Sequence, residues 1–278
     1  MADYSKLPAG GTLKPTPFSA HVDDAKLQQM IELVRLSPIG PAVFENTNAG
    51  RRYGMQREWL ENAKKHWSEQ FDWRTHEKRI NSYPNFKVPV KDDSGVEIDV
   101  HFLALFSEKA DAVPIAFYHG WPGSFLEFLD LLDVLKKKYS PKDLPYHVIV
   151  PSLPGYAYSS GPPLDQDYTI EQASKCLDNL MTGLGFSAYI AQGGDLGSFI
   201  SREQGRSCEA CKGLHLNMLA MGPPENADKL EADELEKKAL AGSQEFSSTG
   251  YAYALEHGTR TATIGLVLSA SPLAMLSW

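Results

Sequence analysis

The feature that most constrains the fold is an alternation of short apolar runs with helical patterns in the middle of the chain. The apolar runs are Val113–Tyr118, His147–Val150, Tyr189–Gln192 and Gly213–Met218, and helical patterns lie between them at Phe125–Tyr139 and Ile170–Leu184. Short runs with no polar alternation are typical of strands that are buried on both faces. Strands that alternate with helices predict an α/β fold with a mostly parallel sheet and helices on both faces.

The region before residue 113 predicts two helices followed by two strands. An amphipathic helix opens at Asp23 and Asp24, and a second helix runs from about Gln56 to Phe71. Phe86–Val90 and Val96–Phe106 are typical of strands joined by a polar turn.

The segments around these elements are less regular. One face of the second helix repeats Trp59, Ala63, Trp67 and Phe71 every four residues, and we expect this face to pack in a core rather than to hold a cofactor. Met1–Pro17 is rich in Pro, Gly and Thr and is interpreted as an arm lying over the rest. The charged segment Pro223–Gly250 is expected to be exposed.

Composition excludes several classes of protein. The chain of 278 residues has a net charge of −8, so it offers no basic surface to a nucleic acid. No apolar run reaches the length of a membrane span and no signal peptide is recognisable. Three cysteines fit a reducing compartment, which predicts a cytoplasmic protein, and the pair Cys208 and Cys211 is interpreted as structural rather than as a redox or zinc motif.

A carboxylate occupies the centre of a strand-to-helix turn. Gly193-Gly194-Asp195-Leu196-Gly197 follows one predicted strand, and its pattern of small residues is that of a nucleophile elbow with Asp in place of Ser. Glycines let strand and helix approach each other, and the helix N-terminus stabilises a negative charge. We therefore expect Asp195 to be ionised and to face solvent or substrate. An ordinary turn with Asp195 as helix N-cap is the alternative.

A second polar loop follows the predicted strand at Val113–Tyr118. Its sequence is His119-Gly120-Trp121-Pro122-Gly123. Because the carboxyl ends of parallel strands meet at one edge of a sheet, we expect this loop to face Asp195. The N–H groups of Trp121 and Leu196 would then form a two-donor oxyanion hole. The sharp turn predicts a cis peptide bond before Pro122, and the alternative is a plain turn before a helix.

Six motifs together carry a family resemblance. They are Phe71-Asp72-Trp73-Arg74, Ile80-Asn81-Ser82-Tyr83-Pro84, His119-Gly120-Trp121-Pro122-Gly123-Ser124, Pro151-Ser152-Leu153-Pro154-Gly155-Tyr156, Gln192-Gly193-Gly194-Asp195 and Ala252-Tyr253-Ala254-Leu255-Glu256-His257. With them the chain resembles the microsomal-type epoxide hydrolases of the α/β-hydrolase fold, and it is most similar to soluble members without a membrane anchor. The resemblance implies an N-terminal arm and helical meander at 1–92, an α/β-hydrolase core at 93–222 and the start of a helical lid at 223–278.

The resemblance also implies a mechanism. Asp195 would attack an epoxide carbon to form an ester, and Tyr253 would protonate the leaving oxygen, with Tyr251 as the competing candidate. A water activated by histidine would then release a vicinal diol. His119, Gly120, Trp121, Pro122 and Leu196 would form the oxyanion hole and bind substrate. No metal or cofactor is implied. The expected partner is a small-molecule epoxide, with a role in detoxification and aromatic hydrocarbon catabolism, and a homodimer is left open.

The sequence departs from the family pattern in its last part. Family members carry a base histidine with an orienting carboxylate, and usually a second lid tyrosine, downstream of the region that ends here at Trp278. Only His215 and His257 follow Asp195, and neither is placed as that base. Thr261 also stands where a Pro is common after the Thr-Arg pair. We therefore expect a C-terminally truncated chain that lacks the last strands and is alkylated once without turnover.

Two other functions remain open at this point. A haloalkane dehalogenase also uses an elbow aspartate, but it commonly places an indole N–H beside the nucleophile, where this chain has Leu196. A non-catalytic protein that binds a small molecule in its apolar cleft is the other alternative, and the missing base is its main support.

Overall fold

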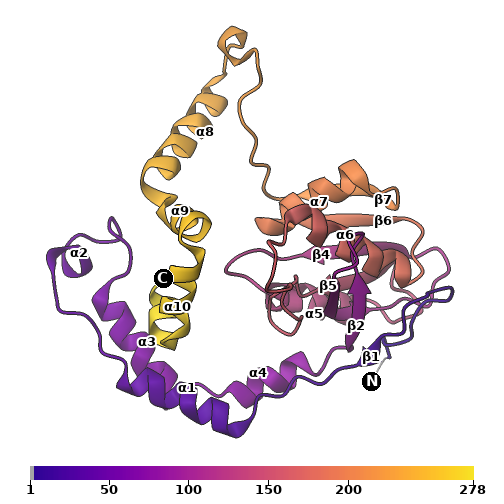
Figure 1. Ribbon diagram of the computed structural model, residues 1–278, viewed down its shortest axis with the longest axis horizontal. Helices are drawn as coiled ribbons and strands as arrows, with labels where there is room; N and C mark the ends of the chain where they lie inside the picture. Colours follow the sequence, from indigo (N-terminus) through magenta and orange to yellow (C-terminus); the bar gives the residue numbers. More distant parts are fainter. Residues whose placement is uncertain (1–2) are drawn as a thin grey trace. The chain divides into compact units, whose positions relative to one another are not determined.

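The predicted parallel strands form one half of a seven-stranded sheet in the computed structural model of the protein, which describes residues 3–278 (Figure 1). The strands are β1 (Thr16–Pro17), β2 (Asn85–Lys91), β3 (Glu97–Leu105), β4 (Val113–Tyr118), β5 (Tyr146–Pro151), β6 (Tyr189–Gly193) and β7 (Cys211–Leu216), in the spatial order β1-β2-β3-β5-β4-β6-β7. β5, β4, β6 and β7 run parallel, and β1, β2 and β3 join them through antiparallel pairs. The arm predicted over Met1–Pro17 supplies all of β1, and its first two residues lie outside the described part.

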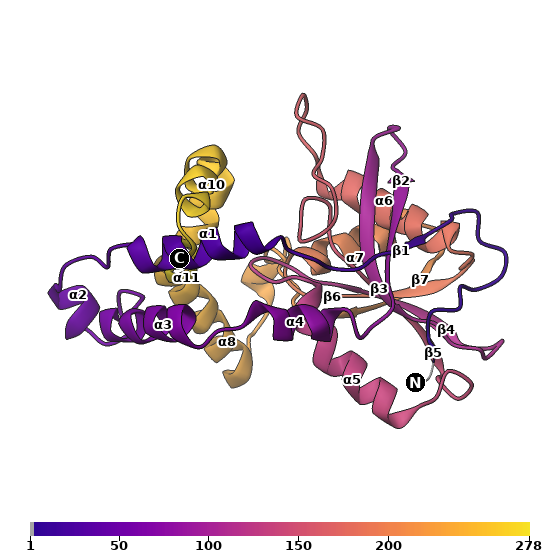
Figure 2. The ribbon, with the colours of Figure 1, turned by 90° about the horizontal axis from the view of Figure 1, so that it is seen from below.

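Three helices connect the parallel strands and cover both faces of the sheet. They are α5 (Leu129–Lys138, after the 3₁₀ turn Phe125–Phe128), α6 (Ile170–Gly183) and α7 (Leu196–Ser207). α6 and α7 pack against each other on one face, and α5 lies on the other (Figure 2). The α/β-hydrolase fold with helices on both faces is thus confirmed.

The main core lies between the sheet and α6. Alternate residues of β3, such as Phe102 and Ala104, are fully buried there against Leu177, Leu180 and Met181 of α6. The start of α6 is fixed by a capping box, in which the Thr169 hydroxyl accepts from the Gln172 N–H and the Gln172 side chain accepts from the Thr169 N–H. A rigid α6–sheet layer therefore supports the strands whose ends carry the site.

The chain divides into two compact units. One comprises the residues up to His21 together with Arg74–Met221, and it holds the whole sheet; the helix α4 (Trp73–Ile80) belongs to it apart from its first residue. The other comprises Val22–Trp73 and Gly222–Trp278.

The regular elements of the second unit are helices and helical turns. They are α1 (Asp24–Leu36), α2 (Phe44–Thr47), α3 (Arg57–Glu69), α8 (Glu234–Glu245), α9 (Ala252–Thr259), α10 (Thr261–Ser269) and α11 (Pro272–Ser277), with a 3₁₀ turn at Ala227–Lys229 and a π turn at Phe246–Gly250. The prediction that the aromatic face of α3 is core is wrong for Trp59, whose side chain is 49% exposed; Trp67 and Phe71 are partly buried. α8 has no buried residue, as predicted for this charged segment. Within the described residues, no helix has both the length and the apolar character to cross a bilayer.

One buried histidine ties β3 to its neighbours. The ring of His101 is fully buried, with Nδ1 2.8 Å from the Ser152 hydroxyl and Nε2 3.2 Å from the Asn85 side-chain oxygen. Burial, with a smaller contribution from the charge of Lys87, lowers the pKa of His101 to about 3. Because the unfolded chain binds a proton near pH 6.5, this histidine stabilises the fold above that pH and ceases to do so as the pH falls toward 3.

We predict that His101 contributes to acid sensitivity. Between pH 7.5 and 4.5 the free energy of unfolding should fall by about 2–3 kcal/mol more in the native protein than in His101→Gln, whose side chain does not titrate. Urea titrations monitored by fluorescence measure this difference. His215→Gln, at an exposed position on β7, should keep the native pH dependence. An equal fall in the native protein and His101→Gln would contradict the prediction.

Candidate active site

Asp195 sits in a strained backbone conformation between β6 and α7. β6 ends at Gly193 and α7 begins at Leu196, and Asp195 has φ +49° and ψ −125°. A non-glycine residue at positive φ is uncommon and costs conformational energy. Asp195 occupies the N-cap position, but its side chain makes no capping hydrogen bond. The alternative of a helix-capping aspartate is therefore wrong, because the carboxylate does not cap the helix that follows it.

The small residues around Asp195 are required by close backbone contacts. A Cβ on Gly193 would lie 2.1 Å from the Gly197 carbonyl oxygen, and one on Gly197 would lie 2.2 Å from the Tyr118 carbonyl oxygen. A Cβ on Gly194 would lie 2.1 Å from Oδ1 of Asn217. The backbone atoms at Gly193 and Gly197 leave no room for a side chain, so this sharp turn needs glycine at those two positions, and a side chain at residue 194 would displace Asn217.

The loop after β4 reaches the same carboxylate. The backbone N–H of Trp121 donates to Oδ1 of Asp195 at 2.7 Å, and a Cβ on Gly120 would lie 2.4 Å from that oxygen. The peptide bond between Trp121 and Pro122 is cis, as predicted. The expectation that the two loops meet at the carboxyl edge of the sheet is therefore confirmed, and the plain-turn alternative for this loop is wrong.

The side chain of His119 fixes the conformation of this loop through two hydrogen bonds. Its Nδ1 donates to the Gly120 carbonyl at 3.2 Å, and its Nε2 accepts from the Leu153 N–H at 3.1 Å. Burial lowers the pKa of His119, which keeps the ring neutral with both nitrogens engaged. His119 is thus a support of the loop rather than a base directed at Asp195.

A cavity of about 560 Å³ opens beside Asp195. It is lined by Tyr118, Gly120, Trp121, Pro122, Gly123, Glu127, Phe128, Gln192, Gly194, Asp195, Asn217 and Met218. Three of the sequence-predicted loop residues, Gly120, Trp121 and Pro122, lie in this wall; His119 lies behind it. The volume falls in the range of small-molecule sites.

The cavity also contains polar residues that sequence reasoning missed. Glu127 lies in the turn after the Trp121 loop, and burial, together with the nearby charge of Asp195, raises the pKa of its carboxyl. Asn217 directly follows β7 and packs against Gly194. The sequence indicates these two residues only by their positions, because each follows a strand whose carboxyl end reaches the same edge of the sheet as Asp195.

Tyr156 adds an aromatic neighbour to the loop. Its ring lies 5.1 Å from the ring of His119 at an interplanar angle of 65°. Burial, and to a lesser extent the charge of Asp195, raises the pKa of the Tyr156 hydroxyl, so the phenol stays protonated at neutral pH. A protonated phenol adds no further negative charge near Asp195.

The remaining sequence-predicted residues are placed as follows. Leu196 is the first residue of α7, next to Asp195, where a helix leaves backbone N–H groups unpaired. His215 is an exposed residue of β7. Tyr253 and His257 lie on α9 in the other unit, with their ring centroids 6.4 Å apart, and Nε2 of His257 accepts from the Trp278 indole at 2.7 Å.

Among the side chains that the structure describes, no group of three or more His, Cys, Asp or Glu is arranged to hold a metal ion. Cys208 and Cys211 are buried free thiols, and burial raises the pKa of each.

The chain is similar to known proteins both in sequence and in structure. Residues 15–128 match the family model described as epoxide hydrolase N terminus, and residues 113–257 match the one described as alpha/beta hydrolase fold. The chain is 56% identical to a Dothistroma septosporum protein named "Putative epoxide hydrolase", over 100% of this chain and 67% of that protein. It superposes on the structure of Aspergillus niger epoxide hydrolase with a TM-score of 0.92 and 45% identity, over 100% of this chain and 71% of that chain.

A third comparison is more distant. The silkworm (Bombyx mori) juvenile hormone epoxide hydrolase structure matches with a TM-score of 0.74 and 25% identity, over 96% of this chain and 62% of that chain. In each comparison the chain spans about two thirds of the relative's length.

We predict that the contact between Gly120 and Asp195 tolerates no side chain. Gly120→Ala should lower the free energy of unfolding by about 1–3 kcal/mol, because the new methyl group overlaps the carboxylate. Gly161→Ala is the matched control, since a Cβ there meets nothing within 4 Å. Urea denaturation of both variants measures the difference. Equal stability of Gly120→Ala and the native protein would refute the close approach of the two loops.

Proposed function

Because the chain belongs to the epoxide hydrolase family, we propose that it opens small epoxides through a covalent ester on Asp195. The observation that carries this proposal is the Asp195 carboxylate at the edge of the 560 Å³ cavity, with one oxygen 2.7 Å from the Trp121 N–H. A carboxylate nucleophile needs a free oxygen lone pair facing a cavity and a fixed orientation, and this arrangement supports both.

Ring opening follows from the chemistry of the two partners. A carboxylate oxygen of Asp195 attacks one epoxide carbon, a new C–O bond forms, and the bond from that carbon to the ring oxygen breaks. The electron pair remains on the ring oxygen, which needs a proton to leave as a hydroxyl. We assign this proton to the phenol of Tyr253, because Tyr253 matches the family motif Ala252–His257.

Release of the diol requires a second step. A water attacks the ester carbonyl, and the N–H groups of Trp121 and Leu196 are proposed to stabilise the resulting oxyanion. This water must lose a proton to a base. His119 does not fit that role because its ring nitrogens are hydrogen-bonded to Gly120 and Leu153. His215 lies on strand β7, and Nε2 of His257 on α9 accepts from the Trp278 indole. We therefore propose that the polypeptide of residues 1–278 stops at the ester.

A binding function without catalysis is the second candidate, favoured by the same histidine geometry. It differs from the first in what Asp195 does. Under a binding function, the cavity holds an epoxide without forming a bond to the protein. A dehalogenase is disfavoured, because the aliphatic Leu196 beside the nucleophile offers no side-chain donor to a departing halide.

We predict single covalent labelling by styrene oxide. Denatured mass spectrometry after incubation should show a mass increase equal to one styrene oxide on the native chain. Asp195→Asn should show none, whereas Asp165→Asn, at an exposed position, should label like the native protein. Unlabelled native protein that still binds styrene oxide would favour the binding function. Steady release of diol over many turnovers would contradict the proposed stop at the ester.

We predict that two neighbouring tyrosines differ in effect. Tyr253→Phe removes the proposed acid and should slow ester formation by about 10²-fold or more. Tyr251→Phe is the matched control on the same segment and should label at a rate close to that of the native protein. The time course of the mass increase measures both rates. A larger loss in Tyr251→Phe would transfer the acid role to Tyr251.

A further inference from the structure

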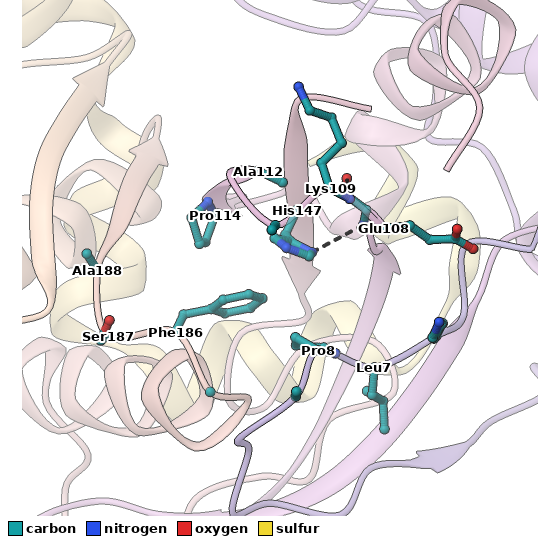
Figure 3. A pocket seen from close by; sticks show the side chains of 15 residues that line it. Leu7, Pro8, Glu108, Lys109, Ala112, Pro114, His147, Phe186, Ser187 and Ala188 are labelled. Atoms are coloured by element: carbon teal, nitrogen blue, oxygen red, sulfur yellow. Dashed lines mark hydrogen bonds between the residues drawn. The ribbon is translucent and has the colours of Figure 1, made fainter. Parts of the chain in front are cut away.

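Figure 3 shows a second cavity, of about 610 Å³. It lies at the opposite end of the parallel strands from Asp195. It adjoins Pro114 at the start of β4 and His147 at the start of β5, whereas the Asp195 cavity adjoins Tyr118 at the end of β4. The remaining wall comes from the arm at residues 6–9, the segment 107–112 after β3 and the turn 185–188 after α6. The two cavities therefore share no lining residue.

The arm that forms one wall is fixed to the sheet unit on both sides of the cavity. The carbonyl of Tyr4 accepts from the Phe106 N–H at 3.0 Å. The N–H groups of Thr12 and Leu13 donate to the Gly183 carbonyl at 2.8 and 2.9 Å. A wall that is hydrogen-bonded at both ends is preorganised, so a ligand would not have to order it.

His147 is the polar group at the centre of this cavity. Its side chain is buried, with the residue 9% exposed, and its Nδ1 accepts from the Ser107 N–H at 3.2 Å. Burial lowers the pKa of His147, so the ring is neutral at pH 7. Because Nδ1 is the acceptor, the proton of the neutral ring is on Nε2. Within residues 3–278 this Nε2–H has no hydrogen-bond partner, and it is accessible from the cavity.

The walls around the His147 ring suit a flat apolar molecule. The Phe186 ring lies 5.0 Å from the His147 ring at 45°, and Pro8 and Pro114 lie near these two rings (Figure 3). Leu7 also lines the cavity. Aromatic and proline side chains offer flat faces against which a planar ring packs well. One buried donor in an apolar wall is the usual pattern of a site that orients a small ligand.

The charged side chains around this cavity are of both signs and do not favour a charged ligand. Lys6 and Glu108 both line the cavity and carry opposite charges. Lys109, the other cation there, lies 3.5 Å from the carboxylate of Asp111. Positive and negative groups therefore balance, and a neutral ligand meets no unpaired charge on entering.

We propose that this cavity is a second binding site, specific for neutral aromatic ketones or alcohols whose oxygen accepts a hydrogen bond from Nε2–H of His147. A purely structural role for His147 explains its Nδ1, which satisfies the Ser107 N–H. It does not involve Nε2–H, which meets no protein acceptor in the described residues and is accessible from the cavity, so this donor can bind a ligand oxygen.

The test uses 1-indanone and indane, which share a ring skeleton and differ in the carbonyl oxygen. Titration of the ¹⁵N-labelled chain with 1-indanone should shift the amides of Ser107 and Phe186 and the Nε2 resonance of His147, saturably. His147→Asn keeps an oxygen that can accept from the Ser107 N–H, but its amide N–H groups are on a shorter side chain and do not reach the position of Nε2. It should bind 1-indanone about ten-fold more weakly, the loss of one hydrogen bond, and indane should bind the native chain more weakly by a similar factor.

Two further variants distinguish binding in this cavity from an effect of unfolding. Ser187→Trp, at an exposed position in the lining, should block the cavity and abolish the shifts, and Leu164→Trp, fully exposed elsewhere, should leave them unchanged. The proposal is overturned if 1-indanone shifts only the amides of Trp121 and Asp195, if it binds no better than indane, or if His147→Asn binds it as the native chain does. Asp195→Asn should retain the binding, so failure of the epoxide proposal leaves this one standing.

Discussion

The hydrogen bond from the Trp121 N–H to the Asp195 carboxylate is the interaction on which the rest of the site depends. It joins two loops that are 74 residues apart in the sequence. It also orients one oxygen of the Asp195 carboxylate at the wall of the cavity. The residue that carries this carboxylate is held at positive φ, and its side chain makes no capping hydrogen bond to α7. The strained backbone of Asp195 thus accompanies a carboxylate that contacts the neighbouring loop instead of capping its own helix.

The parallel sheet supplies the rigidity that this strain requires. β4 and β6 are neighbours, so their carboxyl ends deliver the Trp121 loop and the Asp195 turn to the same edge. Glycines allow the Asp195 turn and the Trp121 loop to approach to distances at which a Cβ would not fit. Both ring nitrogens of His119 form hydrogen bonds that fix the Trp121 loop. A site built on strand ends and tight turns in this way is preorganised before a substrate arrives.

Much of this arrangement could be predicted from the sequence, because the determinants are local. The period of apolar residues located β3 to β7 and the connecting helices to within a few residues, and the glycine pattern around Asp195 identified the turn. The rest depends on long-range contacts. The exposure of Trp59, the two-residue strand β1 at Thr16–Pro17, and the approach of Glu127 to Asp195 are set by which surfaces meet, and no local pattern encodes those.

Two carboxylates, those of Asp195 and Glu127, face the proposed substrate cavity, and the account assigns the covalent bond to only one of them. Proteolytic digestion of the styrene oxide-treated chain, followed by tandem mass spectrometry, locates the modified residue. We predict that the adduct is on Asp195 as an ester labile to hydroxylamine. An adduct on Glu127, or on any other side chain while Asp195 stays unmodified, would contradict it.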